Sequence, residues 1–74
     1  MNILKVYPDR YKAELEFTKF VMFMKELGLT YRMYKTPLMV EVSGKGQVHF
    51  RTRDAQDIKG KHFTAVFIEE TVNV

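Results

Sequence analysis

The chain has 74 residues, with 12 Lys plus Arg, 9 Asp plus Glu and no cysteine. This length allows one domain, residues 1–74, and the lack of cysteine excludes a disulfide scaffold, a Cys-ligated zinc site and thiol catalysis. The net charge of +3 is modest, and it is concentrated in residues 32–61, which carry seven basic and three acidic side chains. An apolar content of 46% is enough for a hydrophobic core and argues against disorder.

The N-terminal third of the chain predicts a strand followed by a helix. Residues 2–7 alternate as a strand does, and Asp9 is placed to cap the helix that follows. From Arg10 to Leu27, apolar residues recur at steps of three and four and make one continuous stripe. Gly28 then predicts the end of the helix, because glycine readily adopts left-handed C-cap geometry.

Three further apolar residues, Leu15, Met22 and Phe23, lie beside this stripe and make the helix more apolar than one buried face requires. One interpretation is a helix seated deeply on a sheet, with these residues under a loop, which is the commoner arrangement in a small domain. The other is a second contact surface for a dimer mate or a partner protein, and it makes the three residues candidate partner-binding residues.

The middle of the chain changes to a period of two, which predicts strands. Residues 30–35 alternate aromatic and polar side chains, and Pro37 requires any continuous strand to bend there or to lie at a sheet edge. Residues 38–42 are a clear strand, and the turn at 43–46, with its two glycines, leads into a returning strand at 47–53. We therefore expect at least one β-hairpin.

The returning strand and its flanks carry basic side chains, which alternate along one strand face. Positive charges in such a row can follow a phosphate backbone. The candidate nucleic-acid-binding residues are Lys45, His49, Arg51, Arg53, Lys59 and Lys61. The alternative is a solvated outer strand face without a ligand, on which Glu41 pairs with an arginine across the hairpin for little energy.

The C-terminal part predicts a polar loop over residues 54–61 and a strand over residues 62–68. This strand is apolar on both faces, as is typical of a central strand, and residues 71–74 either continue it or fray. The elements together predict an α+β domain of order β-α-β-β-β, with one N-terminal amphipathic helix packed on a mostly antiparallel sheet of four to five strands. The sequence leaves open whether the first and last strands pair.

The last third of the chain also contains a weakly specific motif. A polar loop with Gly60 precedes an apolar strand that ends in Glu69 and Glu70, and a hairpin strand precedes the loop. In these features residues 46–70 resemble the Walker B segment of phage terminase large subunits and related P-loop ATPases. The resemblance implies that Glu69 stands where the family holds Mg²⁺ through water, and Glu70 where it activates the attacking water.

The phosphate-binding part of that family is missing from this chain. There is no Gly-x-x-x-x-Gly-Lys-Ser/Thr sequence, and the family's usual first aspartate is replaced by Glu69. The resemblance therefore implies a relic or a mimic of the segment rather than an ATPase. The alternative is an ordinary central strand that leaves the core at a charged edge.

No residues combine into a catalytic or metal-binding pattern. His49 and His62 have no further ligands at metal-binding spacing, and the single serine, Ser43, lies in a glycine turn. We expect no enzymatic activity, no metal, no cofactor and no small-molecule substrate. The N-terminus lacks signal-peptide features and no apolar run is long enough to span a membrane, which predicts a cytoplasmic protein without membrane contact.

Small size without catalytic chemistry favours a binding or regulatory protein of the kind that phages and mobile elements encode. Such a protein would act in the host cytoplasm by protein–protein contact, as a homodimer or as an inhibitor of a larger host or phage machine. The alternative function is a nucleic-acid-binding module, for example one that binds DNA, which uses the basic face of residues 45–61.

Overall fold

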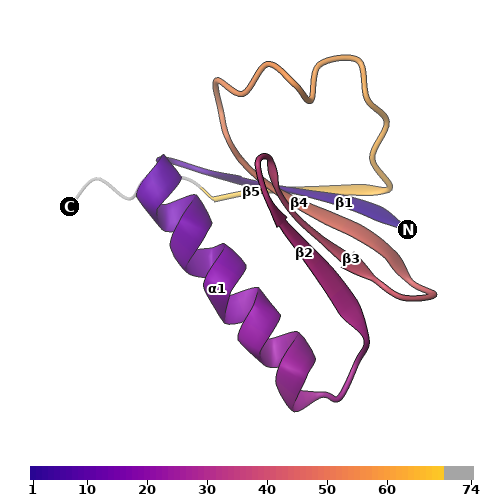
Figure 1. The fold of residues 1–74 in the computed structure, drawn as a ribbon. Helices are drawn as coiled ribbons and strands as arrows, with labels where there is room; N and C mark the ends of the chain where they lie inside the picture. The colour runs from indigo at the N-terminus through magenta and orange to yellow at the C-terminus, as the bar shows by residue number, and fades with distance from the viewer. Residues whose placement is uncertain (70–74) are drawn as a thin grey trace.

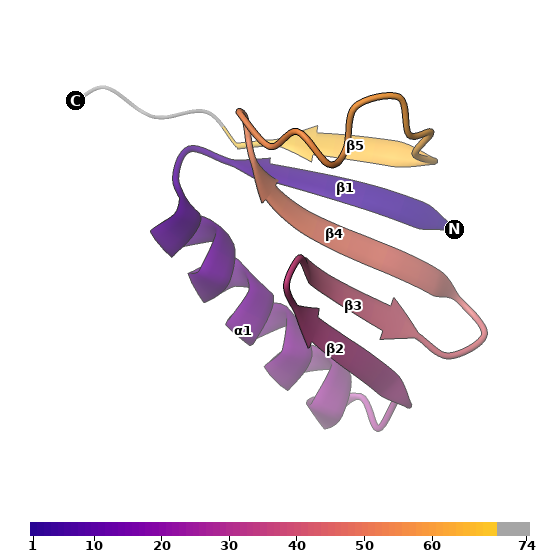
Figure 2. The same cartoon turned by 45° about the horizontal axis from the view of Figure 1, so that its top comes forward.

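One helix packs on one face of a five-stranded sheet (Figure 1, Figure 2) in the computed structural model, which describes residues 1–69. The elements in chain order are β1 (Asn2–Tyr7), α1 (Arg10–Glu26), β2 (Tyr31–Lys35), β3 (Leu38–Val42), β4 (Gly46–Thr52) and β5 (Ala65–Ile68). The strand order across the sheet is β2-β3-β4-β1-β5.

The predicted α+β class, with one helix on a sheet of four to five strands, is confirmed. The β2–β3 and β3–β4 pairings are antiparallel, whereas β1 runs parallel to both β4 and β5. The sheet is therefore mixed rather than mostly antiparallel, and the chain order is β-α-β-β-β-β. The first and last strands do pair, because the long β4–β5 connection returns the chain to the far side of β1.

Both predicted ends of α1 are confirmed by their capping hydrogen bonds. The Asp9 carboxylate accepts the N–H of Lys12 at 2.8 Å, which satisfies a donor of the first helical turn. Gly28 has a φ of 71°, and beyond it the N–H of Leu29 donates to the carbonyl of Met24 at 3.1 Å. This arrangement satisfies helix-end carbonyls and turns the chain toward β2. Within residues 1–69, no helix has the length and apolar character needed to cross a bilayer.

Glycine and proline lie at the turns, as the sequence predicts. Thr36 and Pro37 form the tight connection between β2 and β3, and the peptide bond between them is cis. Gly46 begins β4 with a φ of 131°, and a Cβ atom there would collide with the backbone of Met1. The N–H of Gln47 donates to the carbonyl of Met1 at 2.9 Å, so this glycine allows the start of β1 to approach β4 closely.

The hydrophobic core lies between α1 and the sheet, mainly over β4, β1 and β3. Its buried members are Tyr7, Ala13, Phe17, Met24, Val40, Val42, Val48 and Phe50. Phe50 is only 1% exposed, and its ring centroid lies 5.6 Å from those of both Phe17 and Phe20. The centre of the core is thus an aromatic cluster that joins β4 to the helix.

The prediction of a central strand at residues 62–68 is wrong. The strand is shorter, Ala65–Ile68, and it lies at one end of the sheet with β1 as its neighbour (Figure 2). β3, β4 and β1 hold the interior positions instead. Apolar residues on both faces of β5 therefore do not reflect burial on both faces, since this strand lies outside the part of the sheet that α1 mainly covers. The predicted extension over residues 71–74 falls outside the described residues.

Candidate functional site

The candidate functional site is the outer edge of β5. The register places Val6 opposite Ile68, and the N–H of Glu69 donates to the carbonyl of Val6 at 2.8 Å. In a parallel pair, a residue that bonds across the pair uses both of its backbone groups, and bonding residues alternate along each strand. Leu4 and Val6 therefore bond to the backbone groups of Ala65, Phe67 and Glu69. The N–H and C=O groups of Val66 and Ile68 consequently point away from β1. Within residues 1–69, no strand pairs with this edge.

The side chains of β5 are apolar and exposed on both faces of the sheet. Val66 and Ile68 are 52% and 60% exposed, and they line a shallow groove on the face away from α1. The rest of its lining is mainly apolar, with one charged residue: Leu4, Val6, Ile58, Thr52 and Arg53. Phe67 points to the opposite face and is 57% exposed. An uncharged strand with this much apolar surface and an unpaired edge can accept another strand.

The opposite edge of the sheet has a different character. β2 includes Arg32 and Lys35 among its five residues, and both are exposed. Charged side chains, lysine above all, discourage pairing at a sheet edge. β5 carries no charged residue from Ala65 to Ile68, so this common protection is absent from the β5 edge.

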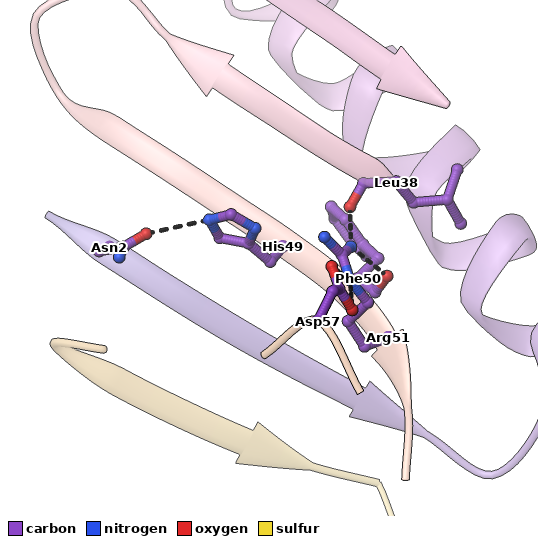
Figure 3. Close-up of polar contacts among 6 residues, drawn as sticks. All are labelled: Asn2, Leu38, His49, Phe50, Arg51 and Asp57. Carbon is purple, nitrogen blue, oxygen red and sulfur yellow. Dashed lines mark hydrogen bonds and ion pairs between the residues drawn. The ribbon is translucent and has the colours of Figure 1, made fainter. Parts of the chain in front are cut away.

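A buried polar cluster on β4 lies under the loop that joins β4 to β5 (Figure 3). The strand registers place it on the same sheet face as Val66 and Ile68. Arg51 is 6% exposed, and its Nε donates to both carboxylate oxygens of Asp57, at 3.0 and 3.2 Å. Its Nη1 donates to the carbonyls of Leu38 and Phe50. The guanidinium thus fastens the loop to β4 and to the start of β3.

His49 contacts the C-terminal end of the same loop, at Phe63. It is 6% exposed, its ring packs edge-on against Phe63 at 5.4 Å, and its Nε2 lies 3.1 Å from Oδ1 of Asn2. The Asn2 amide in turn donates to the carbonyl of His62. Burial lowers the pKa of His49, and the nearby cations Arg51 and Lys61 lower it further, with a smaller opposing effect of Asp57.

This burial predicts that the domain loses stability as the pH falls through the range of histidine titration. The pKa of His49 in the folded state lies below its value of about 6.5 in the unfolded chain. As the pH falls, the unfolded state therefore takes up a proton before the folded state does. The stability that neutral His49 contributes is fully present above the pKa of the unfolded state, and it is lost as the pH falls from there toward the lower pKa of the folded state.

Urea unfolding between about pH 7.5 and 5.5 measures this effect. We expect His49→Leu to flatten the decrease in the free energy of unfolding across this range. His62→Gln, at an exposed position, is the matched control and is expected to keep the decrease. An unchanged slope in His49→Leu would assign the effect to another group.

The prediction that the basic strand face is solvated is wrong for its two central residues. His49 and Arg51 are buried under the loop and are occupied by intramolecular partners. Of the remaining candidates, Lys45 and Arg53 are exposed but lie beyond opposite ends of β4. The exposed Lys59 and Lys61 belong to the covering loop. The structure therefore does not bring the six candidate residues together on one surface.

The three candidate partner-binding residues of α1 are all exposed. Leu15 is 37%, Met22 58% and Phe23 53% exposed, so the interpretation that a loop covers them is wrong. Helical periodicity places Leu15 and Met22 opposite the buried Phe17 and Met24. The three residues remain a second candidate contact surface, with Leu15 and Met22 on the far side of the helix from the sheet and Phe23 on its flank.

The predicted acidic pair lies only partly within the described residues. Glu69 follows β5, with its Oε1 at 4.0 Å from Nζ of Lys12, and Glu70 is outside the described residues. No group of three or more His, Asp or Glu side chains in residues 1–69 is arranged to hold a metal ion. The Walker B resemblance therefore stays a prediction.

Comparisons with protein-family models, with curated proteins and with solved structures gave no match. The candidate site is thus defined by its geometry: an exposed, uncharged, apolar strand with a free backbone edge. The sequence pattern did not predict this site. The apolar residues on both faces, which suggested a central strand, instead form the exposed surface of an edge strand, and strand order is not encoded in that alternation.

Proposed function

We propose that this chain is a non-catalytic binding protein that recognises another polypeptide by strand addition at the β5 edge. The observation that carries the proposal is the combination of exposed Val66, Phe67 and Ile68 with backbone groups that have no strand beside them in residues 1–69. In strand addition, main-chain hydrogen bonds supply affinity, and alternate side chains supply specificity.

The shape of the site agrees with this mode of binding. An added strand would extend the sheet beyond β5, and its side chains on the face away from α1 would cover the groove beside Val66 and Ile68. Its backbone would satisfy the outward N–H and C=O groups. A nucleic acid offers no row of matching donors and acceptors, and the two most central basic residues, His49 and Arg51, are buried.

Site-specific photo-crosslinking in cells tests the proposal. We expect a photoreactive phenylalanine analogue at position 67 to form covalent adducts with a polypeptide, and these adducts should survive nuclease treatment. The matched control carries the analogue at Tyr34, which is 41% exposed on β2 at the opposite edge of the sheet. We expect few adducts there, and fewer at position 67 when Ile68→Lys is also present.

Two results would overturn the proposal. One is an absence of polypeptide adducts at position 67 above the level at Tyr34. The other is adducts that disappear with nuclease, which would favour nucleic-acid contact through the exposed Arg53, Lys59 and Lys61. The regulatory and phage-related context predicted from the sequence becomes testable once such an adduct is identified.

A further inference from the structure

Resting on the proposed function, we infer that the strand added to β5 is β5 of a second copy of this chain, in antiparallel orientation and centred on Phe67. Two copies would then form one continuous ten-stranded sheet. The inference follows from which backbone groups are free, from the side chains that the pairing brings together, and from the charges at the two ends of β5.

The free backbone groups select the register. The outward groups of β5 belong to Val66 and Ile68, as the bond from Glu69 to Val6 and the pairing with β1 require. In an antiparallel pair, hydrogen-bonded residues exchange both of their groups. If Val66 of each copy pairs with Ile68 of the other, all the outward N–H and C=O groups of these two residues are hydrogen-bonded. Phe67 then lies opposite itself on the two-fold axis.

This register also matches the side chains. A two-fold axis perpendicular to the sheet keeps both helices on one face and both β4–β5 loops on the other. Val66 and Ile68 of the two copies would form one apolar strip that continues the groove over Leu4 and Val6. The two Phe67 rings would be neighbours on the helix face, and aromatic cross-strand pairs of this kind stabilise sheets.

The charges around β5 favour antiparallel over parallel pairing. The segment before the strand is basic, with Lys59 and Lys61, whereas Glu69 follows the strand directly. Antiparallel pairing directs each Glu69 toward the basic end of the other copy and separates the two carboxylates. Parallel pairing would place like charges side by side. A four-residue edge buries less area than a standard interface, so we expect dimerisation in the micromolar range.

Sedimentation equilibrium of the full chain over micromolar concentrations measures the dimer. We expect Ile68→Lys to weaken dimerisation at least tenfold, because it places two cations in the apolar strip. Met22→Lys is the matched control, since Met22 on α1 is similarly exposed, 58% against 60% for Ile68. A chain that is monomeric at every concentration, or equal effects of the two variants, would overturn the inference.

The register is tested by a single cysteine, because the chain has none of its own. Opposed Phe67 residues would form a non-hydrogen-bonded pair with Cα atoms about 4.5 Å apart, within the range for a disulfide. We therefore expect Phe67→Cys to form a covalent dimer on mild oxidation much faster than Met33→Cys, which is 53% exposed on the other edge strand. Equal rates would exclude this register.

Hydrogen exchange on the unaltered chain provides a measurement that no folding defect can affect. We expect the amides of Val66 and Ile68 to gain protection as the concentration rises, whereas the N–H of Glu69, already bonded to Val6, should change little. No gain would overturn the inference. If dimerisation fails while crosslinks from position 67 to another polypeptide persist, the inference falls and the proposed function stands.

Discussion

Phe50→Ala is expected to lower the free energy of unfolding by about 3–5 kcal/mol. The total stability of a domain of this size is about 4–11 kcal/mol, so the variant should be partly or largely unfolded at 25 °C. The physical reason is position: Phe50 is 1% exposed and contacts the rings of Phe17 and Phe20 from α1 and of Tyr7 from β1. Loss of the Phe50 ring leaves a cavity where α1 meets β4 and β1.

Urea denaturation followed by circular dichroism measures this change. Phe67→Ala is the matched control, because it removes the same atoms from a side chain that is 57% exposed. In dilute solution we expect it to change the free energy of unfolding by less than about 0.5 kcal/mol. Similar losses in the two variants would show that the aromatic cluster around Phe50 does not hold the helix on the sheet.

Asp57→Ala is expected to have the second largest effect, a loss of about 1.5–3 kcal/mol. Asp57 is the only carboxylate bonded to the buried guanidinium of Arg51 among the described residues. Removing it leaves a cation that is 6% exposed without its counter-charge, and this desolvated charge is the main cost. The loop between β4 and β5 also loses its attachment near Asp57, so its amides should exchange faster.

The double variant Asp57→Ala/Arg51→Met separates the two contributions. Methionine keeps much of the arginine's length and removes the charge, so the double variant should be more stable than the sum of the single losses predicts. Recovery will be incomplete, since the carbonyls of Leu38 and Phe50 also lose their donor. Strictly additive losses would mean that Arg51 and Asp57 are not coupled.

The local elements were predictable because their causes are local. The helix from Arg10 is set by its apolar period, by the capping carboxylate of Asp9 and by the left-handed Gly28. The hairpin of β3 and β4 follows from alternation and from a glycine turn. Each of these signals acts over a few residues, so neighbouring sequence is sufficient to specify it.

The burial of His49 and Arg51 was not predictable in the same way. Alternation correctly placed both on the face opposite Phe50, but it could not say what covers that face. The cover is the β4–β5 loop, which carries Asp57 and Phe63 to within contact distance of the two residues. A polar residue in a strand is solvated or buried according to what another part of the chain brings to it, and strand periodicity contains no such information.

Composition, hydrophobic period and turn residues were sufficient to establish the α+β class, the absence of thiol chemistry and an N-terminal helix whose apolar stripe covers a sheet. The edge position of β5, the burial of the central basic residues and the mixed character of the sheet became known from the three-dimensional fold alone. The reason is that strand order depends on long-range pairing, here the return of β5 to β1 across some sixty residues. The most apolar strand thereby became the exposed edge, and with it the candidate site for a second chain.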